Sequence, residues 1–495
     1  MSTTDGLYGA VQRGIIKEMF KLAASDDKKS IVRAIGLAEK ITPDNHKAEM
    51  RFVKDKVKAN HPALKIARHV VHDLSPVCRD GFINAFVVNA LLRGSQKRQD
   101  FTDRTGLSTP FTVLVSPTMR CNLHCEGCYA SRYSSQSDMP AALLQRIVDE
   151  AAEMGVYLIT VLGGEPFMRR DLLDVVAANP DTYFQIFTNG TLVSPAHVER
   201  LAKLGNVALM LSIEGDAQAT DERRGPGTYR ELMRTMDLLK AHGVLFGYSA
   251  TVTRHNWPML LSDEFVDPLV AKGAALSWHF LYMPVGGAPD TTLMPTPEQR
   301  NEIRLGIQRL RNTKAMFPVD FWGDAPWVGG CIAGKHYMHI NNEGWVEPCI
   351  FTHFAADNIA DTSLAEAFNG PYFREIRARQ PFNHNLLMPC MLIDNPSQSR
   401  EIMAQTGARP THEGAESLVT GLCGALDQYA ADVTRVYEPL WDDEEGKPTE
   451  RAGLAGETDH SDQTDETDQA DHSDQTDQTD EADREIAAEP ALSER

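Results

Sequence analysis

The chain has 495 residues, a net charge of −20 and eight cysteines. This length suffices for two or three domains or for one large barrel with additions, and so few cysteines exclude a secreted disulfide scaffold. The N-terminus lacks a basic segment followed by an apolar run, and no apolar stretch approaches the roughly 20 residues that a membrane span needs. We therefore expect a cytoplasmic protein without a membrane span, in which clustered cysteines bind metal or carry out redox chemistry.

The negative charge is concentrated at the C-terminus. Residues 442–495 hold 20 acidic and four basic side chains, a net of −16, which leaves −4 of the total −20 for the rest of the chain. Aspartate stands at every third position from Asp459 to Asp483, a pattern that cannot bury apolar surface and repels itself. We expect residues 441–495 to form a disordered acidic tail. The nearly neutral remainder lacks the basic clusters that indicate binding to nucleic acid.

Residues 1–106 are predicted to be a helical region. Apolar residues recur at helical spacing in residues 9–25, 30–41 and 81–94. The last of these segments, GFINAFVVNALLRG, is too short to cross a bilayer, and we expect it to be a buried helix. The alternative is an interfacial helix or one wall of a pocket for a lipid substrate.

From residue 107 to residue 312, short apolar strands alternate with amphipathic helices. Strands are expected at residues 111–116, 156–162, 183–188, 206–213, 245–252 and 276–282. Six successive β–α units predict an α/β fold with a parallel sheet and helices outside it. This sheet is expected to form a partial (β/α)6 TIM-like barrel, with a doubly wound sheet as the alternative. In a barrel, the active site lies on the loops at the C-terminal ends of the strands.

Residues 313–440 are predicted to be a small extension. YMHI at 337–340 and WVEP at 345–348 read as a β-hairpin that turns at Asn341–Gly344. Helical stretches follow, and the last of them runs into the acidic tail.

Three cysteines, Cys121, Cys125 and Cys128, follow the first predicted strand with the spacing C-x3-C-x2-C. A structural zinc site usually has four protein ligands, often as two C-x2-C pairs. Three close thiolates without a fourth instead suit an iron–sulfur cube with one iron left open. An open iron can bind a small molecule through an amine and a carboxylate.

This loop resembles the signature of the radical S-adenosylmethionine (radical SAM) enzymes, and the resemblance covers roughly residues 110–282. It implies that the three cysteines hold a [4Fe–4S] cluster and that S-adenosylmethionine occupies the fourth iron. The resemblance also implies that the reduced cluster cleaves S-adenosylmethionine, and that the resulting 5′-deoxyadenosyl radical abstracts a hydrogen from the substrate. The electron would come from a small donor protein such as a flavodoxin or ferredoxin.

Polar motifs at four further strand ends agree with this resemblance: LGGEP, FTNGT, LSIEG and YSATVTRHN. They imply contacts to S-adenosylmethionine from Gly163, Gly164, Glu165, Thr188, Asn189, Ser212, Ser249 and Arg254. Ser249 and Arg254 would hold the methionine carboxylate, and Ser212 and Glu214 would reach the ribose or the substrate. Arg224, in the loop after the fourth strand, is expected either to hold cofactor or substrate or to be a surface arginine.

One position departs from the family. An aromatic residue often precedes the third cysteine there and packs near the adenine, but this chain has Gly127. The adenine contact is therefore left open between Tyr129, Tyr282 and other residues. His279, on the sixth strand, is expected to be a packed histidine rather than a catalytic one.

A second group of cysteines lies in the extension. The segment from Cys331 to Cys349 is similar to the start of the SPASM or twitch extensions of radical SAM enzymes, which hold auxiliary [4Fe–4S] clusters. The chain lacks the dense C-x2-C-x5-C run of a full SPASM domain, so we expect at most one auxiliary cluster, with Cys331, Cys349 and Cys390 as ligands. Cys423 is either a fourth ligand or a buried thiol, and Cys78 is structural. The alternative is that the trio are unconnected buried thiols.

The sequence thus predicts a radical SAM enzyme, an oxidoreductase or a bond-forming enzyme, whose catalytic residues are unknown. Its substrate is expected to be a peptide or cofactor precursor, another small molecule, or a lipid or terpenoid. The alternative is a non-catalytic iron–sulfur or zinc-binding protein.

Overall fold

The computed structural model describes residues 61–445 and, before them, only residues 29, 32, 35, 36, 54 and 55. The chain divides into two compact units, Met1–Gly456 and Glu457–Arg495, and every described residue belongs to the first. The predicted acidic tail lies outside the described residues except for its first five positions, which continue helix α18 (Cys423–Glu445). Most of the helical segments predicted at residues 9–25 and 30–41 also lie outside them.

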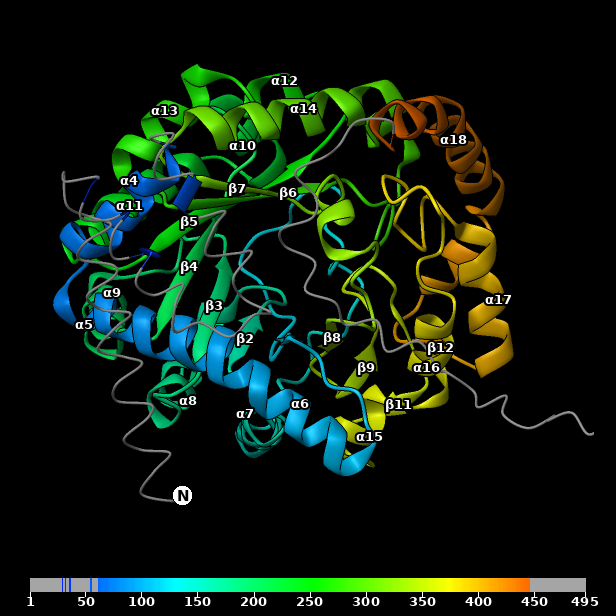
Figure 1. The fold of residues 1–495 in the computed structure, drawn as a ribbon, viewed down its shortest axis with the longest axis horizontal. Coiled ribbons are helices and arrows are strands. Elements are labelled where there is room, and N and C mark those ends of the chain that lie inside the picture. The colour runs from blue at the N-terminus through cyan, green and yellow to red at the C-terminus, as the bar shows by residue number, and fades with distance from the viewer. Residues whose placement is uncertain (1–28, 30–31, 33–34, 37–53, 56–60, 446–495) are drawn as a thin grey trace, which may run out of the picture. The chain divides into compact units, whose positions relative to one another are not determined.

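A ten-stranded sheet in the order β11-β9-β8-β1-β2-β3-β4-β5-β6-β7 forms the centre of the first unit (Figure 1). The first six strands in chain order are those predicted, and their ends agree with the prediction within two residues. They are β1 (Thr112–Val115), β2 (Leu158–Val161), β3 (Tyr183–Thr188), β4 (Val207–Ser212), β5 (Phe246–Val252) and β6 (Leu276–Leu281). All six are parallel. Five of the six residues of β4 are buried, as expected for a strand that is covered on both faces.

Two further parallel strands extend the sheet beyond the six predicted. β7 (Phe317–Asp320) pairs with β6, and β8 (Tyr337–Ile340) pairs with β1 at the other side. The predicted hairpin is confirmed, because β8 pairs with antiparallel β9 (Trp345–Glu347), which pairs in turn with β11 (Asp357–Asn358). β7 and β11 are the two edges, so the sheet is an open, partial barrel.

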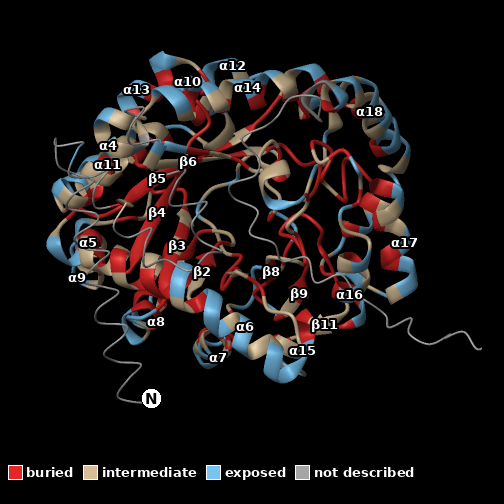
Figure 2. Ribbon diagram, in the orientation of Figure 1, coloured by how far each residue is buried: buried red, intermediate tan, exposed pale blue. Residues whose placement is uncertain are grey.

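The helices between the strands cover the outer face of this sheet, and the strands beneath them are mostly buried (Figure 2). They are α7 (Ala141–Glu153), α8 (Leu172–Ala178), α9 (Pro195–Leu204), α10 (Ala217–Arg224), α11 (Thr228–Ala241), α12 (Trp257–Leu260), α13 (Asp263–Lys272) and α14 (Pro297–Thr313). Local signals fix their ends. In α9, Ser194 and His197 form a reciprocal capping box, and Gly205 ends the helix in the left-handed conformation.

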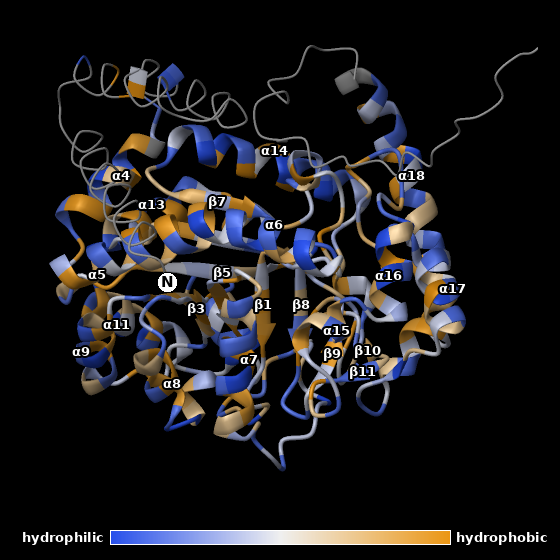
Figure 3. Cartoon of the chain, turned by 60° about the horizontal axis from the view of Figure 1, so that its bottom comes forward, coloured by the Kyte–Doolittle hydropathy of each residue, from blue (hydrophilic) through white to orange (hydrophobic). Residues whose placement is uncertain are grey.

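Between residues 61 and 111, all of which the structure describes, four helical segments precede β1: α4 (Ala63–His72), α5 (Pro76–Gly81), the π-helix η2 (Phe82–Arg93) and α6 (Gly94–Thr105). They pack against residues that come just before the strands. Asn89 Nδ2 donates to the carbonyl of Asp181, before β3, and Arg98 Nη1 donates to that of Gly155, before β2. The segment predicted to be a buried helix is therefore helical and covers the N-terminal ends of the strands. The hydrophilic helix α6 runs across this end in Figure 3.

The residues after β9 form a smaller region beside the sheet. It contains the two-stranded pair β10 (Phe354–Ala355) and β12 (Arg409–Pro410), and the helices α15 (Leu364–Phe368), α16 (Pro371–Ala378), α17 (Pro396–Thr406) and α18. Short 3-10 helices connect other elements, at Pro166–Met168, Thr291–Leu293, Ala325–Val328 and Ala415–Val419. α18 packs against both α14 and α17, and thereby joins the extension to the outer helices.

Candidate cluster and cofactor site

A cavity of about 410 Å³ lies at the C-terminal ends of the strands. Cys121, Cys125 and Cys128 line it, in the loop after β1. It is also lined by six of the eight residues predicted to contact S-adenosylmethionine: Gly163, Gly164, Thr188, Asn189, Ser212 and Ser249. Glu165 and Arg254 are not among the described residues that line it. The fold thus brings the ends of β1 to β6 to one place, as the motifs predicted.

The three thiols of this loop are surrounded by hydrogen-bond donors. The N–H of Leu123 donates to Cys121 Sγ at 3.5 Å, and Asn189 Nδ2 lies 3.8 Å from the same sulfur. Arg224 Nη1 lies 4.0 Å from Cys125 Sγ, and the N–H of Ala130 hydrogen-bonds to Cys128. Burial raises the pKa of Cys121 to about 11 and also raises that of Cys128. Bound iron favours the thiolate, and these donors suit the sulfurs of an anionic cluster.

The two glycines after β2 pack directly on the chain that leads into the cysteine loop. A Cβ on Gly163 would lie 2.2 Å from the carbonyl oxygen of Thr118, and one on Gly164 would lie 2.3 Å from that of Arg120. Gly163 also has a φ of +121°, which disfavours any side chain. The N–H of Gly164 donates to the Thr118 carbonyl at 3.0 Å. Any side chain here would push the cysteine loop away from β2.

Glu165 is fully buried, and its carboxylate joins the ends of β2 and β3. Oε1 accepts hydrogen bonds from Thr188 Oγ1 at 2.7 Å and from the N–H of Phe167 at 3.0 Å, and Oε2 accepts from the N–H of Asn189 at 2.7 Å. Burial raises the pKa of Glu165, although the hydrogen bonds oppose this effect. The carboxylate therefore positions Thr188 and Asn189 at the cavity wall, a role that the motif alone did not indicate.

Two arginines at the end of α10 share one carboxylate. Arg223 Nη1 lies 2.6 Å from Glu214 Oε1, and Arg224 Nη2 lies 2.5 Å from the same oxygen. Burial works against the charge of Arg224, but Glu214 and the thiols of Cys125 and Cys128 outweigh it and raise its pKa. Both arginines line the cavity, so Arg224 is not a surface residue. Two positive charges against one carboxylate make this wall suited to an anion.

Arg254 points elsewhere, since its Nε donates to the carbonyl of Met294 at 3.0 Å. Tyr282, at the end of β6, and Tyr129 both line the cavity. His279 is 1% exposed and is absent from the described residues that line the cavity, which supports a packed histidine, and burial lowers its pKa to about 4.

A buried polar network beside the cavity was not predicted. Tyr133, which lines the cavity, donates to Glu347 Oε1 at 2.8 Å, and Thr411 Oγ1 donates to the same oxygen at 2.6 Å. His339 Nδ1 lies 2.6 Å from Glu347 Oε2, and its Nε2 lies 2.7 Å from Ser116 Oγ. The one sequence signal for it is the hairpin register, which pairs His339 with Glu347.

The cysteines of the extension repeat the local geometry of the first loop. In each case the cysteine sulfur accepts a hydrogen bond from the N–H of the residue two positions later in the chain. In the extension the donors are Ala333 for Cys331, Phe351 for Cys349 and Leu392 for Cys390. In the first loop they are Leu123 for Cys121 and Ala130 for Cys128. Cys331 lies within electrostatic range of Cys349 and Cys390, and Tyr337 OH donates to Cys349 Sγ at 2.9 Å. These donor sets fit iron–sulfur ligands at both places. Cys78 differs, because its thiol donates to the Ala202 carbonyl at 3.8 Å.

No three His, Cys, Asp or Glu side chains within the described residues lie close enough to share one metal ion. The ligands of a cubane bind different irons, so the spacing of both cysteine groups remains compatible with clusters. In the same part of the chain, no helix is both long and apolar enough to cross a bilayer.

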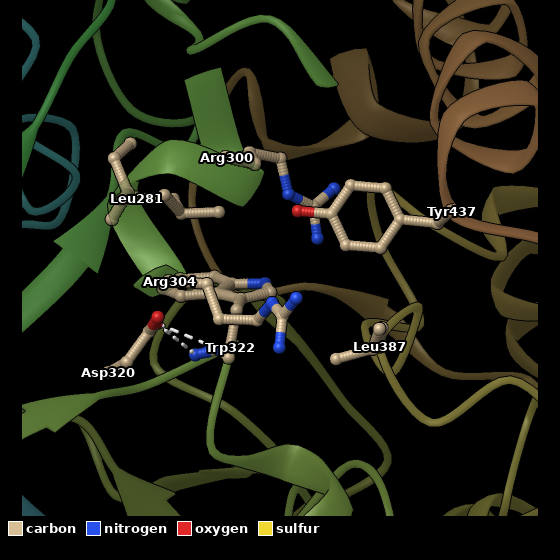
Figure 4. A pocket seen from close by; sticks show the side chains of 9 residues that line it. Leu281, Arg300, Arg304, Asp320, Trp322, Leu387 and Tyr437 are labelled. Atoms are coloured by element: carbon tan, nitrogen blue, oxygen red, sulfur yellow. Dashed lines mark hydrogen bonds between the residues drawn. The ribbon is translucent and has the colours of Figure 1, made fainter. Parts of the chain in front are cut away.

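A second cavity, of about 10 Å³, lies between α14 and α18 and is lined by Arg300, Asp320 and Tyr437, among others (Figure 4). Asp320 Oδ1 accepts the N–H of Trp322 at 3.2 Å. Burial, with the nearby charge of Asp324, raises the pKa of Asp320 to about 6. A cavity of this size holds about one water molecule, so it is not a substrate site.

Comparison with known proteins gives two family matches. Residues 115–256 match the radical SAM superfamily, and residues 331–391 match SPASM, an iron–sulfur cluster-binding domain. Mycofactocin maturase MftC of Mycobacterium tuberculosis is 30% identical over 297 residues, which cover 56% of this chain and 74% of that protein. AdoMet-dependent heme synthase of Oleidesulfovibrio alaskensis is 28% identical over 299 residues, covering 54% and 76%. PqqA peptide cyclase of Gluconobacter oxydans is 25% identical over 287 residues, covering 54% and 80%.

Among solved structures, Streptococcus suis SuiB bound to S-adenosylmethionine aligns with a TM-score of 0.51 at 20% identity. The alignment covers 60% of this chain and 76% of SuiB. At this identity the likeness bears on the fold, which it supports.

Proposed function

Because the chain belongs to the radical SAM superfamily, we propose that Cys121, Cys125 and Cys128 bind its [4Fe–4S] cluster and that S-adenosylmethionine occupies the cavity beside them. When bound, the reduced cluster supplies the electron that cleaves S-adenosylmethionine and starts radical chemistry on the substrate. The observation that carries this assignment is that one cavity unites the three cysteines with six motif residues from the ends of β2 to β5, four of them polar and two glycines.

The protein's own residues bind and orient the cofactor. Gly163 and Gly164 allow the cysteine loop to pack against the end of β2. Glu165 accepts hydrogen bonds from Thr188 and Asn189 and so fixes these two residues in the cavity wall. Asn189 and Arg224 place donors beside the sulfurs of Cys121 and Cys125, which would bind the cluster. Ser212 and Ser249, whose hydroxyl oxygens are 3.4 Å apart, line the cavity and would hold the ribose and methionine portions.

We assign the methionine carboxylate to Arg223, supported by Ser249, in place of the predicted Arg254. Arg223 lines the cavity and shares the Glu214 carboxylate with Arg224, so this wall keeps a net positive charge. Arg254 is committed to the Met294 carbonyl instead. A carboxylate binds best where such an excess of guanidinium charge is partly desolvated.

The substrate that the cavity suits best is a peptide that inserts an uncharged side chain. The walls are rich in aromatic rings, contributed by Tyr129, Tyr133, Phe187, Phe280, Tyr282 and Phe351. None of the described residues that line the cavity is an Asp, Glu or Lys, and its two arginines already face Glu214 and the cofactor. PqqA peptide cyclase acts on a peptide by its name, and this relative supports the same class here.

The alternative substrate is a tetrapyrrole, favoured by similarity to the heme synthase. A tetrapyrrole carries several carboxylates and is large, while the cavity must hold both S-adenosylmethionine and the reacting group in about 410 Å³. The shortage of free cations therefore favours a peptide side chain. A lipid or terpenoid gains no support from the N-terminal helices, because they cover the opposite ends of the strands.

The first test is anaerobic. The protein is reconstituted with iron and sulfide, reduced with dithionite and given S-adenosylmethionine, and 5′-deoxyadenosine is measured. The wild type should form it, and Cys125→Ala should not, while Cys423→Ala serves as the matched cysteine control. A Cys125→Ala variant that forms as much 5′-deoxyadenosine as the wild type would refute the assignment of the cluster.

The second test identifies the substrate class. Perdeuterated short peptides that contain one Val, Leu, Phe or Tyr are compared with a deuterated porphyrin and deuterated farnesol. Transfer of deuterium into 5′-deoxyadenosine reports abstraction from the compound itself. We expect transfer from peptides alone, and transfer from the porphyrin alone would overturn the peptide proposal. The electron donor in the cell is proposed to be a flavodoxin or ferredoxin, because the cluster needs single electrons at low potential.

A further inference from the structure

The extension contains three cysteines that are candidate cluster ligands, whereas a cubane cluster has four irons. Cys331, Cys349 and Cys390 each receive the N–H from two residues ahead, and each sulfur has a second donor. For Cys331 this is the N–H of Met391, and for Cys390 it is the N–H of Ile393. Such donors stabilise thiolates bound to iron and are not needed by buried neutral thiols.

The position that could supply a fourth thiolate holds an apolar side chain. Ile393 stands three residues after Cys390, where a C-x2-C pair would place its second cysteine, and it is fully buried. Its N–H hydrogen-bonds to Cys390 Sγ, which places the backbone of residue 393 beside the sulfur that a cluster would use. The chain therefore has the first cysteine of a C-x2-C pair, with isoleucine at the position of the second.

The carboxylate beside Cys390, that of Asp394, is paired with an arginine. Asp394 Oδ1 lies 2.6 Å from Arg300 Nη1, and its Oδ2 lies 3.3 Å from Arg300 Nη2. Asp394 Oδ2 also accepts the N–H of Cys390 at 3.0 Å. Both partners are buried, and breaking such a pair would leave an uncompensated charge. Asp394 thus positions the Cys390 loop and is not free to bind iron.

We propose that the auxiliary [4Fe–4S] cluster is held by only Cys331, Cys349 and Cys390, and that its fourth iron takes an exchangeable small ligand with an anionic oxygen, carbon or sulfur donor. This inference rests on the proposed function, because it concerns the cluster of the SPASM region. Tyr337 belongs to the same site, since its hydroxyl donates to the Cys349 sulfur.

Such a site has a distinct chemistry. An iron without a protein thiolate is released on oxidation: ferricyanide removes one electron, and [4Fe–4S]²⁺ gives [3Fe–4S]⁺ and one Fe²⁺. A cluster with four thiolates resists this loss. The open iron also binds cyanide, whose ¹³C nucleus couples to the reduced cluster and can be detected by electron–nuclear double resonance.

The test uses the full chain with Cys121, Cys125 and Cys128 all replaced by Ala, so that any cluster belongs to the extension. After reconstitution we expect about four irons per chain. Ferricyanide should then produce a [3Fe–4S]⁺ electron paramagnetic resonance signal of about one spin per chain, and [¹³C]cyanide should give a coupled signal in the reduced protein. If the triple variant misfolds, the oxidation is repeated on the wild-type protein with S-adenosylmethionine bound, because the bound S-adenosylmethionine protects the first cluster.

Two further variants sharpen the outcome. Ile393→Cys, made in the same triple-Ala chain, restores the missing thiol and should abolish both the [3Fe–4S]⁺ signal and cyanide binding. Cys423→Ala should change neither. Retention of four irons under ferricyanide without cyanide coupling would overturn the proposal, and a cluster destabilised by Cys423→Ala would identify Cys423 as the fourth ligand instead.

A triple variant that folds but binds no iron would also overturn the proposal. Formation of 5′-deoxyadenosine by the wild type is measured separately, so failure of the three-cysteine site is distinguishable from failure of the proposed function.

Discussion

The ring of Tyr282 lies against the backbone of Gly127, the residue just before the third cysteine. A Cβ on Gly127 would lie 2.6 Å from Tyr282 Cε2, and Gly127 has a φ of +61°. The N–H of Asp290 donates to Tyr282 OH at 3.3 Å and helps to fix the ring. Gly127 leaves space for this ring, and we therefore expect Tyr282, at the end of β6, to supply the aromatic surface that radical SAM enzymes often have at the position of Gly127.

We predict that Tyr282→Ala weakens binding of S-adenosylmethionine about 5- to 160-fold, because stacking of a base on an aromatic ring contributes ~1–3 kcal/mol. Gly127→Ala should weaken it as well, since the new methyl group displaces the ring and strains the backbone. Anaerobic calorimetry on the reconstituted protein measures both. Tyr282→Phe keeps the ring and serves as the control, and equal losses in Phe and Ala variants would contradict a stacking role.

Gly164→Ala should lower the iron content of the first cluster site. The methyl group would lie 2.3 Å from the Arg120 carbonyl, directly before Cys121, so the cysteine loop must shift. Gly421→Ala is the matched control, because its Cβ meets no atom within 4 Å. Iron per chain and the absorbance of the cluster report the result. Full cluster content in Gly164→Ala would show that the loop tolerates the shift.

Arg223→Gln should raise the dissociation constant of S-adenosylmethionine about 10- to 160-fold, because a hydrogen bond to a charged group contributes ~1.5–3 kcal/mol. Arg254→Gln should leave it nearly unchanged, since Arg254 bonds to the Met294 carbonyl. The same comparison with decarboxylated S-adenosylmethionine isolates the carboxylate, whose absence should remove the difference between wild type and Arg223→Gln. A larger increase in the dissociation constant for Arg254→Gln than for Arg223→Gln would restore the assignment of the carboxylate to Arg254.

Glu347→Gln should destabilise the fold by about 3 kcal/mol, because it breaks a buried network that includes the His339 contact. Burial opposes ionisation of Glu347, but hydrogen bonding and the charge of His339 outweigh it and lower its pKa. The stabilisation is therefore present above the unfolded pKa, about 4.3, and is lost as the pH falls through the lower folded value. Urea midpoints against pH test this, with exposed Glu343→Gln as control. A gap between wild type and Glu347→Gln that widens in acid would contradict the sign.

Asp320→Asn should stabilise the protein at pH 8 by about 3 kcal/mol. Burial raises the pKa of Asp320 to about 6. The contribution of Asp320 to the free energy of unfolding is therefore fully present below the unfolded pKa and is lost as the pH rises through 6. Asparagine keeps the oxygen that accepts the N–H of Trp322 and Gly323. The gain should vanish towards pH 4. Exposed Asp361→Asn is the control, and a loss of stability at pH 8 would refute the prediction.

Local sequence patterns predicted the features whose residues are contiguous in the chain. The cysteine loop and the strand-end motifs were recognised because each lies within a few residues, and parallel strands then bring their ends together. β7 was not predicted because it is short and contains Pro318, which lacks an N–H and weighs against a strand in sequence reasoning. The proline is tolerated because β7 is an edge strand. Arg254 was assigned by its position after β5, but the direction of a long side chain depends on partners such as the Met294 carbonyl.

Tyr133 and Glu347 had no such signal. They are 214 positions apart, and a tyrosine and a glutamate are individually unremarkable. Only the pairing of β8 with β1, together with the hairpin register, brings them into contact. The aromatic walls of the cavity were missed for the same reason, since Phe187 and Phe351 come from distant segments.

The pairing of β8 with β1 has a consequence for dissecting the molecule. Truncation after residue 330 would delete β8, β9 and β11. One side of β1, the strand that leads into the cysteine loop, would then be unpaired, while β2 would still pair with the other side. An unpaired apolar edge strand is a template for aggregation. The radical SAM core of this chain should accordingly precipitate when expressed alone, and its extension acts as an edge cap that a soluble catalytic fragment would have to retain.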